Sequence, residues 1–128
     1  MIQCLHSGTQ SITSTAATVA YSGGTIAIGT RVTQSGSTVV IGSGVSKVKV
    51  SYGIMSENGG TASYLYSRIK INAAELSQQI DGSTSQFRST SDSRIFSVSS
   101  GDVISVVADS GGGSLNIRYG QLIVEVLE

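Results

Sequence analysis

KVKVSYGIM, residues 47–55, alternates between apolar and polar side chains over most of its length. Successive side chains of a β-strand point to opposite faces, so a period of two predicts a strand with one buried face. Four residues would share that buried face: Val48, Val50, Tyr52 and Ile54. The polar positions Lys47, Lys49 and Ser51 would face the other side. This stretch predicts a half-buried strand of a sheet protein.

Residues 64–71 follow the same pattern. One face would carry Leu65, Ser67, Ile69 and Ile71. The other face would carry Tyr64, Tyr66, Arg68 and Lys70. Shorter runs of the same kind occupy residues 18–21, 25–28, 38–41, 94–98, 115–119 and 121–127.

Between these runs the sequence is rich in turn residues, with sixteen glycines and no proline. Residues 56–60 (SENGG) separate two alternating segments and suit a hairpin turn with positive backbone φ angles. Short strands at regular spacing predict an all-β protein, a two-sheet antiparallel jelly-roll sandwich of about 8–10 strands. Neither an internal repeat nor a linker is visible, so we expect residues 1–128 to form a single jelly-roll domain.

Two runs, 103–108 and 122–127, are apolar on both faces or nearly so. In a two-sheet sandwich one face packs on the other sheet, and the second apolar face needs another cover. Large bare apolar patches are uncommon on monomers, so the pattern favours an oligomer. The predicted interface residues are Tyr64, Tyr66, Arg68, Val103, Ile104, Val106, Val107 and Tyr119. For the tyrosine and arginine positions, a solvated sheet face or a ligand site are the alternatives.

The composition narrows the classes of function. Charged residues make up only 12% of the 128 residues, and eight basic residues balance eight acidic ones. Nucleic-acid binding needs a cationic stripe, which is not visible, so no nucleic-acid partner is expected. No apolar run approaches the ~20 residues that span a bilayer, so membrane insertion is not expected. The first residues lack a secretory signal pattern, which favours synthesis in a cytoplasm followed by lysis or particle assembly.

Catalytic and metal chemistry find little support in the sequence. His6 is the only histidine and Cys4 the only cysteine, so a nucleophilic triad or a zinc site lacks partners. Cys4 is interpreted as a small buried residue. Four aspartates lie in or beside Gly/Ser turns, where capping is the main expectation and calcium the alternative: Asp81, Asp92, Asp102 and Asp109. We therefore expect no enzyme activity, no cofactor and no metal.

Four segments together resemble the complement-type globular head and tumour necrosis factor superfamily, in a form found in phage and bacterial proteins. They are an early strand at 18–21, a strand, glycine turn and long strand at 38–52, a Gly-Asp-x-Val motif at 99–106 and a closing strand at 119–127. The opening residues MIQCLHSGTQ are similar to the start of small virion proteins of phages of Gram-positive bacteria.

The resemblance implies a tight homotrimer with loops displayed at one end for binding. The function expected from it is a trimeric virion module, either head decoration or fibre, or a tail receptor-binding tip. Its partners would be copies of itself and either other virion proteins or a host-surface ligand, and its location the virion. The alternative is a trimeric extracellular adhesin or ligand-like binding domain of a bacterium.

Overall fold

The computed structural model describes residues 1–57, 62–83 and 85–128. This part of the chain contains twelve β-strands and no helix, and hence no helix long and apolar enough to cross a membrane. The strands are β1 (Ile2–Leu5), β2 (Gln10–Ile12), β3 (Ala17–Thr18), β4 (Gly24–Ala27), β5 (Val32–Ser35), β6 (Thr38–Ile41), β7 (Lys47–Glu57), β8 (Leu65–Ile71), β9 (Ala74–Asp81), β10 (Phe87–Ser97), β11 (Val103–Asp109) and β12 (Leu115–Val126).

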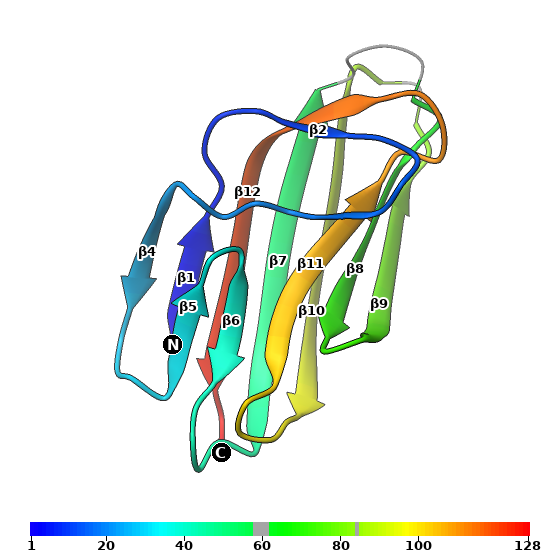
Figure 1. The fold of residues 1–128 in the computed structure, drawn as a ribbon. Helices are drawn as coiled ribbons and strands as arrows, with labels where there is room; N and C mark the ends of the chain where they lie inside the picture. Colours follow the sequence, from blue (N-terminus) through cyan, green and yellow to red (C-terminus); the bar gives the residue numbers. More distant parts are fainter. Residues whose placement is uncertain (58–61, 84) are drawn as a thin grey trace.

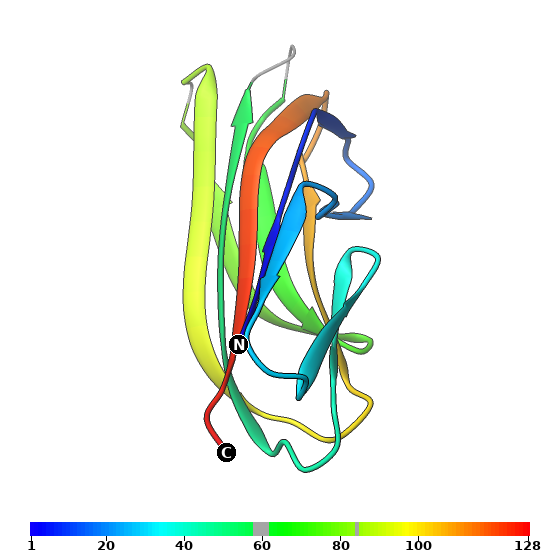
Figure 2. The same cartoon turned by 90° about the vertical axis from the view of Figure 1, so that its left-hand side faces the viewer.

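The strands form two antiparallel sheets that face each other (Figures 1 and 2). The first sheet has the order β10-β7-β12-β1-β4, and β2 also pairs with β12. The second has the order β5-β6-β11-β8-β9, and β3 also pairs with β11. Strands distant in sequence are neighbours, since β12 lies between β7 and β1. The predicted all-β, two-sheet antiparallel sandwich is thus confirmed.

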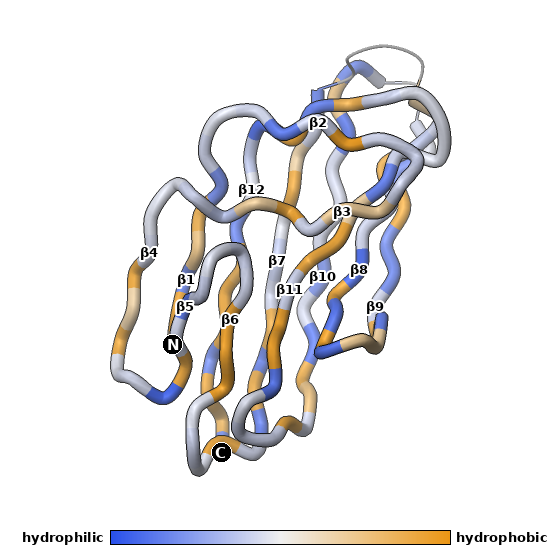
Figure 3. The backbone as a smooth tube through the Cα atoms, in the orientation of Figure 1, coloured by the Kyte–Doolittle hydropathy of each residue, from blue (hydrophilic) through white to orange (hydrophobic). Residues whose placement is uncertain are grey.

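Residues 47–55 lie in β7, and their alternate apolar side chains are buried as predicted. Val48, Val50, Tyr52 and Ile54 are at most 3% exposed, and all four face the second sheet. The opposite β8 contributes Leu65, Ile69 and Ile71 to the same core. Figure 3 shows how apolar positions recur along the strands. The core therefore lies between the two sheets, where β7, β12, β8 and β11 are its central strands.

A polar cluster crosses the same interior on the β8 and β10 side. The hydroxyl groups of Tyr52 and Ser67 are 2.7 Å apart, and those of Ser67 and Thr90 are 2.6 Å apart. Buried hydroxyl groups are costly unless they are hydrogen-bonded. The three residues satisfy one another, and so they link β7 and β10 of the first sheet to β8 of the second.

The structure corrects several predicted strand bounds. Only residues 94–98 were predicted in the region of β10, whereas the strand runs from Phe87 to Ser97. Residues 115–119 and 121–127 were predicted as two strands but belong to one, β12, with an irregular register between Ile117 and Tyr119. Twelve strands exceed the predicted number because short segments such as β2 and β3 pair at the margins. The predicted hairpin turn at 56–60 falls largely on residues 58–61, outside the described residues.

A turn at the start of β11 is held by Asp102. One carboxylate oxygen accepts a hydrogen bond from the Ser99 N–H, and the other accepts one from the Asn72 side-chain amide, both at 2.8 Å. Asn72 has a φ of 54° and also bonds the Val103 backbone. The hydrogen bonds from Asn72 and Ser99 lower the pKa of Asp102 below its ordinary value. The carboxylate therefore ties the β8–β9 turn to the start of β11.

The first testable prediction concerns Ile104, which is fully buried in the single chain. Ile104→Ala should lower the free energy of unfolding by about 2–5 kcal/mol, because it removes core contacts and leaves a cavity. Val103→Ala, at the neighbouring position on the opposite face, should cost much less. Denaturant unfolding of both variants measures the difference. Equal losses would show that Ile104 is not a core residue.

The second prediction concerns acid stability. Because its folded pKa is lowered, Asp102 contributes stability above its unfolded pKa near 4, and this contribution is lost as the pH falls through the folded pKa. Asp102→Asn should therefore be less stable than the wild type at pH 7, and the difference should narrow towards pH 3. Ser100→Asn, at an exposed position of the same turn, is the control. A destabilisation by Asp102→Asn that does not change with pH would contradict this assignment.

Candidate functional site

The structure places seven of the eight predicted interface residues on or beside two neighbouring strands of the second sheet. Tyr66, Arg68, Val103, Ile104, Val106 and Val107 lie on β8 and β11, and Tyr64 directly precedes β8. Val107 is paired with Arg68, and Asp109 with Tyr66, so these four share the outer face of the sheet. Tyr119 lies on β12 in the other sheet. The predicted set is therefore divided between opposite faces of the sandwich.

Arg68 forms the centre of a compact polar cluster on this outer face. Its Nε donates to Glu75 and its Nη1 to Asp109, both at 2.8 Å, and the side chain is only 8% exposed. The guanidinium also lies over the ring of Tyr66, 4.5 Å from the ring centre. Burial opposes the charge, but hydrogen bonds to Asp109 and Glu75 outweigh it and raise the pKa of Arg68. The charge of Arg68 is satisfied within the chain.

Tyr64 is held in a similar way. Its ring meets that of Tyr66 edge to face, with centroids 6.3 Å apart and planes at 85°. Gly111, with a φ of 65°, packs directly on the Tyr64 ring, where an added methyl group would overlap it. The Tyr64 N–H also bonds the Ser110 carbonyl at 3.2 Å. The β11–β12 loop thus covers Tyr64.

The apolar residues of β11 need no second subunit to cover them. Ile104 and Val106 are 0% exposed and belong to the core between the sheets, so their use as contact residues has to be corrected. Val107 points outward, yet only 5% of it is exposed. Its neighbours on β8 and β3 provide the cover that we had expected from another copy. The apolar run therefore marks a central strand of the monomer.

The first sheet, by contrast, presents an apolar outer surface that its own chain leaves uncovered. Phe87, Ile95 and Tyr119 are exposed by 55%, 61% and 63% respectively. Three further apolar residues on this side are half-buried: Leu5, Met55 and Ile123. We call these six residues the apolar face. Their strand partners point outward with them, since Tyr119 is paired with Met55 and Ile123 with Ser51.

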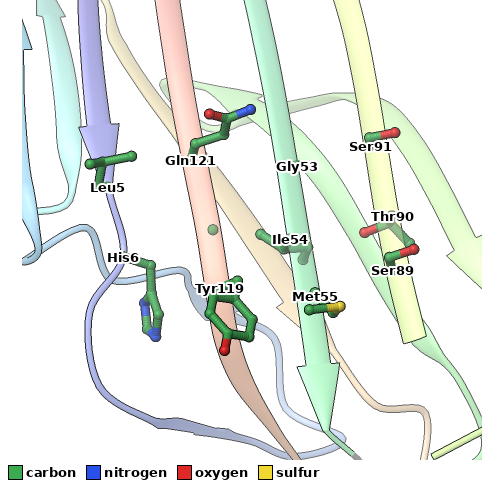
Figure 4. Close-up of a pocket in the computed structure, with 11 residues that line it drawn as sticks. Leu5, His6, Gly53, Ile54, Met55, Ser89, Thr90, Ser91, Tyr119 and Gln121 are labelled. Atoms are coloured by element: carbon green, nitrogen blue, oxygen red, sulfur yellow. The ribbon is translucent and has the colours of Figure 1, made fainter. Parts of the chain in front are cut away.

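A shallow groove of about 520 Å³ crosses the apolar face (Figure 4). Glycines line it where β7 and β12 adjoin, with Gly53 paired to Gln121 and Gly120 paired to Ile54. A methyl group at Gly120 would come within 3.3 Å of the His6 Cβ. Tyr119, Leu5 and Met55 stand around it. Protruding aromatic and apolar side chains beside a glycine-lined groove are suited to contact another surface.

Charged residues on this side are confined to its two ends. Lys49 lies 3.9 Å from Glu125, and Lys47 lies 2.9 Å from Glu128, at one end. Arg118 lies 2.9 Å from Glu57 at the other. The outward residues of β7 and β12 between them are uncharged. A charge-free centre with paired charges at the rim is the distribution found in protein–protein interfaces.

Cys4 and His6 do not form a reactive pair. Cys4 is 1% exposed and faces the core, as expected, and burial raises the pKa of its thiol. A buried protonated thiol is a poor nucleophile. His6 Nδ1 lies 2.5 Å from the Ala20 carbonyl, and its Nε2 is buried without a hydrogen-bond partner among the described residues.

The other aspartates also serve local structure. Asp81 accepts hydrogen bonds from the backbone N–H groups of Ser83 and Ser89, chiefly the former, and these bonds lower its pKa. Asp92 accepts from Ser77 and pairs with Arg94 at 2.9 Å. Burial opposes the charge of Asp92, but these hydrogen bonds lower its pKa. Within residues 1–57, 62–83 and 85–128, no group of three His, Cys, Asp or Glu residues is placed to hold a metal ion.

Sequence reasoning missed Phe87 and Ile95 as surface residues. They lie eight positions apart on one strand whose other residues are mostly Ser, Thr, Arg and Asp. Only the pairing of β10 with β7 brings them to the same side as Met55. Both residues have odd numbers, which places them on the same face of one strand. This could be predicted only by recognising that a single strand runs from Phe87 to Ser97.

No family model matches the chain, and no curated protein matches it. Solved structures do. The PRD1 vertex protein P5 is similar with a TM-score of 0.74 and 17% identity, covering 99% of this chain and 96% of that one. Murine APRIL gives 0.70 and 11% identity over 98% of both chains. Eiger TNF from S. frugiperda gives 0.70 and 13% identity over 100% of this chain and 92% of that one. The fold is therefore the tumour necrosis factor-like jelly roll.

Proposed function

We propose that this protein is a structural and binding module of a phage virion that assembles as a homotrimer through the apolar face. The apolar face is the observation that carries the proposal. Three large apolar side chains on it are each more than half exposed, whereas Val107, the outward apolar residue of the central strand β11, is only 5% exposed. Covering the exposed part of one such side chain contributes about 1–2 kcal/mol, and a symmetric assembly repeats this contribution at each contact. We assign no catalytic step to the protein.

The second sheet is the less suitable contact surface. Its outer face carries Arg68, Glu75 and Asp109, which satisfy one another. Bringing another subunit onto Glu75 and Lys70 would remove water from charges without offering them new partners, which is costly. The trimer contact proposed here therefore uses Tyr119 from the residues predicted in sequence, and replaces the β8 and β11 residues with Phe87, Ile95 and their neighbours.

Similarity to a phage vertex protein along nearly the whole chain supports a place in the virion. Only 12% of the residues are charged, which fits a protein whose surface is partly covered in an assembly. The proposed partners are copies of itself and either other virion proteins or a host-surface ligand. The proposed trimer is compatible with decoration, fibre and receptor-binding roles.

A second function is favoured by a separate observation. APRIL and Eiger TNF are similar over nearly the full chain with the same TM-score of 0.70. An extracellular trimeric ligand or adhesin of a bacterium would use the same fold. Immunogold labelling of purified phage particles distinguishes the two: virion labelling supports the first function, and labelling of the surface of uninfected bacteria supports the second.

The third testable prediction uses two isoleucines of equal exposure. Ile95 on the apolar face and Ile80 on β9 of the second sheet are both 61% exposed. Ile95→Glu should dissociate the trimer, because it would bury a carboxylate in the contact beside Lys49, whose charge Glu125 already balances. Ile80→Glu should leave it intact. Light scattering at micromolar concentration should give three times the chain mass of 13.1 kDa for the wild type and Ile80→Glu, and a single chain mass for Ile95→Glu.

Tyr119→Glu tests the centre of the same surface and should also give single chains. Circular dichroism checks that both apolar-face variants keep the β fold. A wild-type protein of single chain mass would reject the trimer. A trimer lost in Ile80→Glu but kept in Ile95→Glu would place the contact on the second sheet, as the sequence-based prediction had it.

A further inference from the structure

The two open sides of the sandwich are built differently. On the side where β9 and β10 end the sheets, polar bonds join the two layers. Ser77 of β9 bonds Asp92 of β10, and the Ser89 N–H of β10 donates to Asp81 of β9 at 2.9 Å. This side of the sandwich is closed by its own chain.

On the other side β4 and β5 end the sheets. A cleft of about 610 Å³ lies between them. Its buried wall includes the apolar residues Ile2, Tyr21 and Val32, each 2% exposed. None of the twelve residues that line it carries a formal charge. One side-chain bond, from Thr25 to Gln34, crosses from β4 to β5. The cleft thus leads from solvent towards the hydrophobic core.

β4 forms the rim of this cleft, and no second strand of the described residues pairs with its outer edge. The Ile28 N–H donates to the Met1 carbonyl at 2.8 Å, and the N-terminal amino group of Met1 donates to the Ile28 carbonyl at 3.0 Å. In an antiparallel ladder hydrogen-bonded pairs alternate with non-hydrogen-bonded pairs. The Ile26–Gln3 pair is therefore bonded like Ile28–Met1, whereas Ala27 and Thr25 are at non-bonded positions opposite β1. The N–H and C=O groups of Thr25 and Ala27 therefore point away from the sheet. All four residues of β4 are exposed.

The side chains of β4 do nothing to block pairing. Ile26 and Ile28 are 54% and 66% exposed and stand on one face, two positions apart. Residues 22–30 contain neither a charged residue nor a proline, the two residue types that commonly protect edge strands. An added strand would find hydrogen-bonding groups on β4, apolar neighbours on its outer face and the cleft on its inner face.

We propose that β4 binds an extended, uncharged segment of another polypeptide by strand addition. The segment would pair with Thr25 and Ala27, and its alternate small apolar side chains would enter the cleft beside Tyr21 and Val32. Backbone bonds of this kind provide affinity, and pockets for alternate side chains provide specificity. This site is separate from the trimer contact, because it uses the edge and inner side of β4, whereas the trimer contact uses the outer face around Tyr119.

A segment of a different polypeptide fits this edge better than β4 of a second copy. Pairing β4 with β4 would join only four residues from each chain, whereas a stable interface takes about 20–30 residues from each partner. In a second copy β4 is also paired with β1, so its inward side chains face the cleft of that copy and cannot enter the cleft of the first. A single donated strand buries both the edge and the cleft.

The fourth testable prediction uses a defined probe, the acetylated and amidated peptide Thr-Val-Thr-Val-Thr-Val-Thr with a fluorescent label. It should bind the wild-type protein saturably and slow the hydrogen exchange of the Thr25 and Ala27 amides. A peptide with aspartate in place of valine should not bind. Ala27→Pro removes an N–H that the sheet does not use, a position at which edge strands tolerate proline. It should weaken peptide binding at least tenfold and leave the oligomeric mass unchanged.

Ala27→Arg gives a second test that does not depend on proline. It keeps the backbone N–H but places a charge in the cleft, so it should also weaken peptide binding at least tenfold. Ile80→Arg, on an edge strand of the closed side, is the matched control and should bind as the wild type does. The proposal fails if the peptide does not bind at millimolar concentration, if both Ala27 variants bind normally, or if protection appears on β9 and β10 instead. It also fails if the wild type forms a higher oligomer that Ala27→Pro reduces, because β4 would then pair with β4.

Discussion

The antiparallel pairing of β7 with β12 is the interaction on which the rest of the structure depends. These are among the longest strands, and their register runs from Asn116 opposite Glu57 to Val126 opposite Val48. It brings the C-terminal part of the chain into the middle of the first sheet, between β7 and β1. Once this register is set, alternate residues of both strands must face the second sheet. Val50, Tyr52, Leu122 and Val124 do so and are at most 3% exposed.

The same register determines what the remaining residues can do. The residues of β7 and β12 that do not face the core face outward. Packing between the two sheets therefore does not constrain which side chains these outward positions carry. In this chain the centre of their outer surface is small, uncharged or apolar, with Gly53 paired to Gln121 and Tyr119 paired to Met55. On β8 and β11 the outward positions instead hold Arg68 and Asp109, which bond to each other. The two outer faces therefore differ, and we propose self-association through the first and exposure to solvent for the second.

The parts of the fold predicted correctly from sequence were those with an uninterrupted alternation. Residues 47–55 and 64–71 are strands with the predicted buried faces. The burial of Val107 could not be predicted, because it depends on the neighbouring strands β3 and β8, which periodicity does not identify. Ile104 and Val106 were predicted as interface residues because residues 103–108 are apolar on both faces. The structure explains this run by the position of β11, which lies in the middle of its sheet and is covered on both faces. Phe87 and Ile95 were missed because the residues between them are polar and show no apolar alternation, so one strand carrying both was not predicted.

The central claim is that copies of the chain cover the outer face of the first sheet and leave that of the second sheet open. Hydroxyl-radical labelling of the wild-type protein at micromolar concentration tests it within one sample, because Ile95 and Ile80 have the same intrinsic reactivity and the same 61% exposure in the single chain. The account predicts that Ile95 is labelled several-fold more slowly than Ile80. Equal labelling, or slower labelling of Ile80, would contradict it.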